Sequence, residues 1–197
     1  MSDKIFFATG NRGKVEEMTP IFEKRDLELV QVDADVPEID AMDVEEVAER
    51  KAKDSYQKAL ENGEIEEGQM LIVEDTGFYA EGIGGFPGAE SAFFARTAGA
   101  EKILNLIEEN ENRSAYFKTA LAVIENEEIH VFTGEMTGEI PEKKTGEAHP
   151  HLPYNSFFIP DAGEGESLAE NPELKDESFH RRKAVQKFLD WFEENKS

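Results

Sequence analysis

Residues 4–22 read KIFFATGNRGKVEEMTPIF and decide how the fold begins. The apolar run 4–9 stops at Gly10, which predicts a short buried strand followed by a turn. Beyond the turn, apolar residues recur at helical spacing, at Val15, Met18, Ile21 and Phe22. Pro20 falls inside this helix, and we expect it to kink or shorten it. The stretch therefore predicts a strand, a Gly-rich turn and a helix.

The next segments continue this alternation. Residues 27–32 alternate apolar and polar side chains like a strand, residues 44–62 form an amphipathic helical pattern, and residues 70–73 form a third apolar strand. Strands alternating with helices indicate an α/β fold. Further on, residues 115–124 and 129–140 flank Asn126-Glu127 as a predicted hairpin, and a last helix covers residues 184–192. No linker divides the chain, so we expect a single domain over residues 1–197.

Composition excludes several classes of protein. The chain has 44 acidic and 21 basic residues among 197, a net charge of −23, which argues against binding nucleic acid or an anionic membrane. It has no cysteine for disulfides or zinc ribbons, and no apolar run long enough to span a bilayer. We expect a soluble cytoplasmic protein. Its acidity also fits a salt-rich, halophilic cytoplasm, as a hypothesis.

The turn after the first strand is a candidate phosphate site. It consists of Thr9, Gly10, Asn11, Arg12, Gly13 and Lys14. A Gly-rich turn at a helix N-terminus offers backbone N–H groups and the positive end of the helix dipole to an anion, and basic side chains add charged donors. The sequence is not a P-loop, because Val15 follows Gly13-Lys14. An ordinary strand-to-helix turn with a surface lysine explains the segment equally well.

Two neighbouring carboxylates, Glu74 and Asp75, follow the third strand in the sequence VEDTG. The carboxyl ends of strands in α/β sheets bind ligands, and carboxylate oxygens suit Mg²⁺ and can activate water. Glu38, in the loop after the second strand, is a possible partner of Asp75 in holding the metal. The alternative is a helix-capping aspartate beside a solvated glutamate.

Residues 175–183, KDESFHRRK, form the densest basic run of the chain. Positive charge at the start of a helix opposes the helix dipole, which suggests a functional reason for it. His180 and Arg181 are therefore candidates to contact an anionic or purine ligand. Pairing with nearby acidic residues is the rival interpretation.

Taken in order, these motifs resemble the inosine triphosphate pyrophosphatases, also called non-canonical purine nucleoside triphosphate pyrophosphatases. The matching motifs include TGNRGK at 9–14, Pro37-Glu38, Lys51-Ala52, VEDTG at 73–77 and GGFPG at 84–88, with Lys175 and His180-Arg181 near the C-terminus. The resemblance implies an α/β fold with a mixed central sheet flanked by helices, two lobes around a substrate cleft, and a homodimer. It also implies Mg²⁺-dependent hydrolysis of deaminated purine triphosphates such as ITP, dITP and XTP to monophosphate and pyrophosphate.

The resemblance assigns roles by matching position. Asp75 would be the general base and, with Glu38, a metal ligand, while Glu74 would support the metal site. The triphosphate would contact residues 9–14 and Lys51, with Thr76 and Gly77 approaching the nucleotide. Lys175, His180 and Arg181 would contact the substrate, the last two near the purine 6-oxo group.

The chain departs from this family where the base should bind. Members usually carry an aromatic residue and a carboxylate where this chain has Leu152 and Asn155, within the segment Leu152, Pro153, Tyr154 and Asn155. Phe179 replaces the usual serine before His180-Arg181 and is a candidate replacement for the stacking aromatic. Two alternatives therefore stay open: the same chemistry on another base, and a nucleotide-binding sensor without turnover.

Overall fold

The computed structural model describes residues 3–34, 36, 41, 43–147, 152–174 and 179–196. Glu38 and Lys175 lie outside these residues. The main elements are β1 (Asp3–Ala8), α1 (Arg12–Glu23), β2 (Leu27–Val32), α2 (Val44–Glu61), β3 (Leu71–Ala80), β4 (Pro87–Gly88), α3 (Ser91–Thr97), α4 (Lys102–Leu106), β5 (Ser114–Glu125), β6 (Glu128–Glu139), the 3-10 helix η2 (Pro153–Phe157), β7 (Ile159–Pro160) and α5 (His180–Lys196).

The sheet is mixed, as expected from the resemblance. Its strands lie in the order β2-β1-β3-β5-β6-β7, with β4 paired to β3 outside this path. β1 runs parallel to β2 and β3, whereas the pairs β3–β5, β5–β6 and β6–β7 are antiparallel. The predicted hairpin is confirmed, and Asn126 and Glu127 form its turn with φ values of 50° and 67°. Positive φ at both turn residues matches the twist of paired strands.

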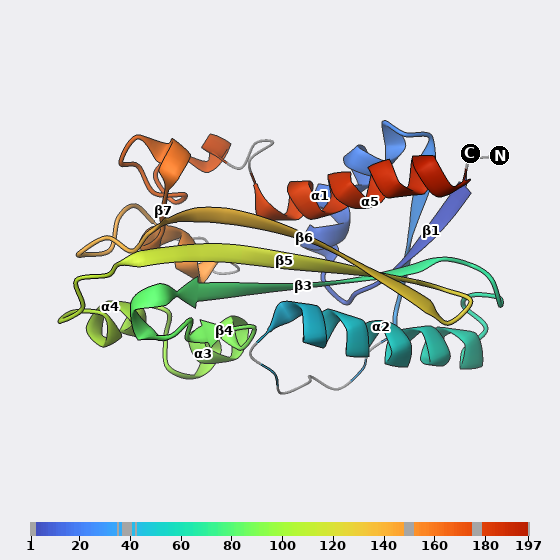
Figure 1. Ribbon diagram of the computed structural model, residues 1–197, viewed down its shortest axis with the longest axis horizontal. Helices are drawn as coiled ribbons and strands as arrows, with labels where there is room; N and C mark the ends of the chain where they lie inside the picture. The colour runs from blue at the N-terminus through green and yellow to red at the C-terminus, as the bar shows by residue number, and fades with distance from the viewer. Residues whose placement is uncertain are drawn as a thin grey trace.

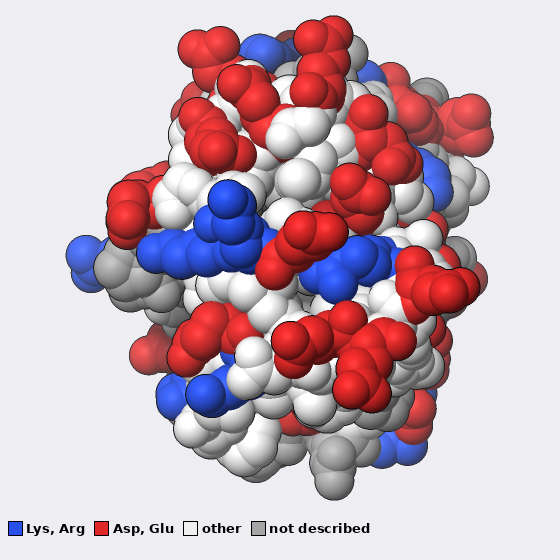
Figure 2. All heavy atoms as spheres, turned by 90° about the vertical axis from the view of Figure 1, so that its left-hand side faces the viewer, with Lys and Arg blue, Asp and Glu red and all other residues white. Residues whose placement is uncertain are grey.

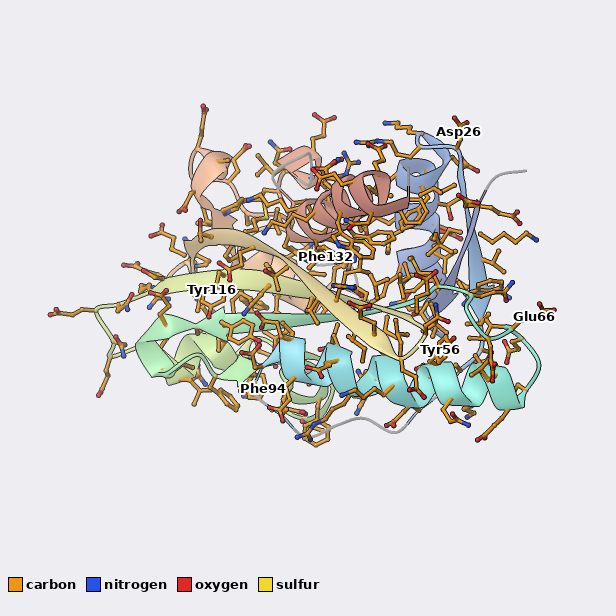
Figure 3. The ribbon with its side chains drawn as sticks, turned by 45° about the vertical axis from the view of Figure 1, so that its right-hand side comes forward. Asp26, Tyr56, Glu66, Phe94, Tyr116 and Phe132 are labelled. Carbon is orange, nitrogen blue, oxygen red and sulfur yellow. The ribbon has the colours of Figure 1, made fainter. Side chains whose placement is uncertain are left out.

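Helices cover both faces of the sheet. α1 and α5 lie on one face and α2 on the other (Figure 1). Phe132 of β6 is partly buried and packs against the core beneath α5, and Tyr56 of α2 lies in the core on the opposite side, as Figure 3 shows. Gly134 of β6 lets the first turn of α5 approach closely, because an added Cβ would lie 2.0 Å from the His180 carbonyl oxygen.

The long strands β3, β5 and β6 extend beyond this helix-covered part into a second lobe. There β4, α3, α4 and η2 surround a separate apolar core that includes Phe78, Phe117 and Phe158 (Figure 1). Around Phe78, the Phe117 and Phe158 rings lie 5.0 and 6.0 Å away between centroids. The architecture is therefore an α/β fold with two lobes joined by continuous strands.

β3 is longer than the sequence predicted. It runs to Ala80, so the carboxylates of Glu74 and Asp75 lie in mid-strand rather than at its carboxyl end. β1 pairs with β3 only at residues 71–72, and β4 only at residues 78–79. Among the described residues no strand pairs with this edge of β3 between those points. The sequence VEDTG at 73–77 therefore lines an open interval in the sheet, just beyond the parallel strands.

Two further differences concern helices. α1 continues through Pro20 to Glu23, so the proline does not end it. Pro20 has no N–H to donate to the carbonyl of Glu16. Both residues are exposed, so water can hydrogen-bond to that carbonyl instead. α3 was not predicted, because its seven residues are too few to show a helical period.

Acidic side chains are spread widely over the surface at the end of the molecule shown in Figure 2 and interrupted by a short row of basic ones. In the part of the chain that the structure describes, no helix is both long and apolar enough to cross a membrane.

Candidate active site

A cavity of about 690 Å³ lies between the two lobes, along the open interval of β3. Most of the site residues suggested by the sequence meet there, although they come from distant segments. The predicted residues that line it are Asn11, Lys14, Lys51, Asp75, Thr76, Leu152, Pro153, Tyr154, Asn155, Phe179, His180 and Arg181. The cavity thus joins the turn before α1, one face of α2, the middle of β3 and the start of α5.

Asp75 and Lys51 form an ion pair within the cavity wall. Lys51 Nζ lies 2.8 Å from Asp75 Oδ1, and both side chains are largely buried. Burial raises the pKa of Asp75 above its ordinary value, against the lowering effect of the Lys51 and Lys14 charges. A carboxylate whose pKa is raised binds a proton more readily than an exposed aspartate does, which suits a general base.

Glu74 points to the opposite face of β3 and is fully buried there between two cations. Its carboxylate forms ion pairs with Lys14 Nζ and with Arg181 Nε, the latter at 3.1 Å. Burial opposes its ionisation, but the charges of Arg181 and Lys14 hold the pKa of Glu74 well below its ordinary value. Arg181 also reaches Glu17 at 2.6 Å. Glu74 thus fixes the positions of two cations at the cavity.

The predicted phosphate turn has a different arrangement from the one expected. The side chain of Asn11 caps α1, and its Oδ1 accepts hydrogen bonds from the backbone N–H groups of Gly13 at 3.0 Å and Lys14 at 3.4 Å. These two donors are therefore already used within the turn. Thr9, Gly10, Arg12 and Gly13 are not among the residues lining the cavity, whereas Asn11 and Lys14 are.

The wall contributed by the second lobe is mainly apolar and aromatic. Tyr154 is buried, stacks on Phe78 with ring centroids 4.6 Å apart, and donates to the Ser91 carbonyl at 2.8 Å. Phe179 is also buried, and its ring centroid lies 4.1 Å from that of His180. Leu152, in contrast, is 41% exposed at the mouth. Such an aromatic wall is suited to stacking against the flat face of a nucleobase.

Sequence reasoning missed the residues that α3 brings to the cavity. Ser91, Phe93 and Arg96 line it from this short helix, and Phe93 is 50% exposed. The available signal was weak: an adjacent aromatic pair and one arginine, following GGFPG, in a chain poor in basic residues. Phe117 was also missed, because an alternating strand does not show which apolar residue borders a cavity.

The described residues fit Mg²⁺ only in part. They contain no group of three or more acidic, histidine or cysteine side chains that could hold a metal ion. Mg²⁺ commonly needs only one or two carboxylates when substrate phosphates complete its shell, and Asp75 supplies one at the cavity. Glu74 is held by Lys14, Arg181 and Thr76, so its position suits support rather than direct ligation. Glu38, the other predicted ligand, lies outside the described residues.

The chain is similar to known proteins over nearly its whole length. The dITP/XTP pyrophosphatase of Methanopyrus kandleri is 38% identical over 194 residues, covering 98% of this chain and 97% of that protein. That of Thermococcus kodakarensis is 34% identical over 192 residues, covering 98% of each. The structure of the Staphylococcus aureus Ham1 protein has a TM-score of 0.81 and 28% identity, covering 99% of this chain and 100% of that one. The Ham1 family profile matches residues 5–191, and the chain belongs to the Ham1 family.

Proposed function

We propose that this protein is a nucleoside triphosphate pyrophosphatase that hydrolyses deaminated purine triphosphates, dITP and XTP among them, to monophosphate and pyrophosphate. The observation that carries the proposal is the buried Asp75–Lys51 pair, which faces the cavity close to Lys14. This pair supports the proposal because a carboxylate that could act as a general base lies beside cations that suit a triphosphate. Relatives named dITP/XTP pyrophosphatase, similar over nearly their whole length, support the substrate class.

In the proposed reaction Asp75 takes a proton from a water molecule. The water oxygen bonds to the α-phosphorus, the bond from that phosphorus to the bridging oxygen breaks, and pyrophosphate leaves. Lys14 and Lys51 hold phosphate oxygens, and their fixed charges favour the transition state, in which negative charge shifts towards the leaving group. Thr76 and Arg181 line the same cavity and contact the nucleotide.

We assign Mg²⁺ to Asp75 and Glu38, with the substrate phosphates completing its shell. The chemistry that Mg²⁺ would supply there is neutralisation of phosphate charge and a lower pKa for a bound water. We further propose that the enzyme is cytoplasmic and a homodimer, as the family resemblance implies, and that the acidic surface tolerates high salt.

The substrate is tested by incubating the protein and Mg²⁺ with ITP, dITP, XTP, GTP, ATP and the pyrimidine triphosphates, at low and at molar salt. We expect pyrophosphate from the first three at rates at least about tenfold above the others, the discrimination available from one or two base contacts. Fastest turnover of a pyrimidine or of ATP would show that the base preference is wrong. Binding without any turnover would favour the sensor, and failure at molar salt would remove the salt hypothesis.

A further inference from the structure

Thr119 of β5 lies behind the cavity wall and contacts two of the residues that line it. Its side chain is fully buried, and its Oγ1 is 2.7 Å from Thr76 Oγ1 and 2.6 Å from His180 Nδ1. Thr76 in turn donates its hydroxyl hydrogen to Glu74 Oε1. Four side chains from β3, β5 and α5 therefore form one continuous chain: Glu74, Thr76, Thr119 and His180.

The hydrogens in this chain can be placed one after another, starting from Glu74. Glu74, held by Lys14 and Arg181, is a carboxylate and can only accept, so the hydrogen between it and Thr76 belongs to Thr76. Thr76 has no second hydrogen, so the Thr119 hydroxyl directs its hydrogen to Thr76 at 2.7 Å, with Glu74 Oε1 as a more distant acceptor at 3.5 Å. Thr119 is then left with lone pairs towards His180. The hydrogen in that last contact must lie on His180 Nδ1.

The surroundings hold the chain in place. Thr119 pairs with Thr76 across β3 and with Gly134 across β6, and the absence of a side chain at Gly134 brings the first turn of α5 against the sheet. Phe117, on β5 like Thr119, stacks its ring on the His180 imidazole at 5.2 Å between centroids and 18° between planes. Stacking on Phe117 therefore fixes the plane of the imidazole, and the contact with Thr119 fixes the ring with Nδ1 towards the hydroxyl.

We propose that Thr119 is a positioning residue that relays the charge of Glu74 to His180 and holds the imidazole hydrogen on Nδ1. In the neutral ring Nε2 is then the acceptor nitrogen. This inference rests on the proposed function for its consequence: His180 lines the cavity, and fixing which ring nitrogen carries the hydrogen fixes where the imidazole can donate and where it can accept. Thr119 itself does not line the cavity and acts only through His180.

The relay is tested first without substrate, by nitrogen and carbon NMR of the histidine rings at alkaline pH. The His180 signals are assigned by their loss in His180→Gln. We expect the Nδ1–H tautomer in the wild type and in Thr119→Ser, and loss of this tautomer preference in Thr119→Val, which keeps the side-chain volume but removes the hydroxyl. An Nε2–H ring in the wild type, or an unchanged ring in Thr119→Val, would overturn the proposal.

Kinetics give the second test. We expect Thr119→Val to raise KM for dITP about tenfold, the effect of one misplaced buried hydrogen-bond partner, with little change in kcat. Thr119→Ser should restore KM, and Thr133→Val, the same substitution in neighbouring β6, should change neither constant. If Thr119→Val does not fold, Thr76→Val breaks the relay one step earlier and serves the NMR test. If no nucleotide is hydrolysed, the proposed function fails while the NMR result still decides the relay.

Discussion

Asp75→Asn is expected to lower kcat for dITP by about 10²- to 10⁴-fold, the contribution of a general base. Asparagine has nearly the same size but cannot take a proton from water. It also leaves Lys51 without its carboxylate partner at 2.8 Å, so the lysine is held less firmly at the triphosphate. Because burial raises the pKa of Asp75, its charged form is unfavourable to the folded state at neutral pH, so we expect Asp75→Asn to destabilise the protein less than Glu74→Gln does.

The matched control is Asp54→Asn on α2, one turn from Lys51 but exposed to solvent. It should leave kcat within about twofold of the wild type, because surface substitutions away from a site have small effects. Both variants should show the circular dichroism and melting temperature of a folded protein. If the Asp75→Asn protein is folded and turns over dITP at a near-normal rate, Asp75 is not the general base.

Glu74→Gln is expected to give the largest loss of stability, about 3 kcal/mol or more, the cost of removing one partner from a buried ion pair. The change leaves Lys14 and Arg181 without the carboxylate between them, although Arg181 keeps Glu17. Denaturant unfolding at neutral pH measures this loss. Glu17→Gln is the control: it removes a pair that is partly exposed on the glutamate side, and should cost no more than about 1 kcal/mol.

The loss should also depend on pH. Because the pKa of Glu74 is lower in the folded protein than in the unfolded chain, where a glutamate titrates at about 4.3, its stabilising contribution is fully present above that pH. The contribution is lost progressively as the pH falls further. The difference between wild type and Glu74→Gln should therefore be greater at pH 7 than at about pH 3. An equal difference at both values would show that the charge of Glu74 is not what stabilises the protein.

The sequence predicted the regular elements well because their patterns are local. Residues 27–32 form β2 as expected, and the apolar spacing of residues 44–62 gives α2 within one residue. The hairpin is also where its turn residues predicted it. Among the site residues, Lys51, Asp75, His180 and Arg181 meet at one cavity, which helical and strand periodicity alone could not show.

What the sequence could not show depends on contacts between distant segments. The open interval of β3 exists because β1 and β4 pair with different ends of that strand, and neither pairing leaves a local pattern. The capping of Gly13 and Lys14 by Asn11 depends on a side-chain rotamer, not on residue type alone. In the sequence Thr119 is indistinguishable from any other threonine in a strand, and only the structure shows its contacts with Thr76 and His180.

To identify the bond that is cleaved, dITP is hydrolysed with Mg²⁺ in water enriched in ¹⁸O, and the masses of the products are measured by mass spectrometry. Water attack at the α-phosphorus puts one ¹⁸O into dIMP and leaves the released pyrophosphate unlabelled, and this is the result we expect. Label in the pyrophosphate would show attack at the β-phosphorus. Release of dIDP with labelled orthophosphate would show attack at the γ-phosphorus, and either outcome would contradict the proposed reaction at Asp75.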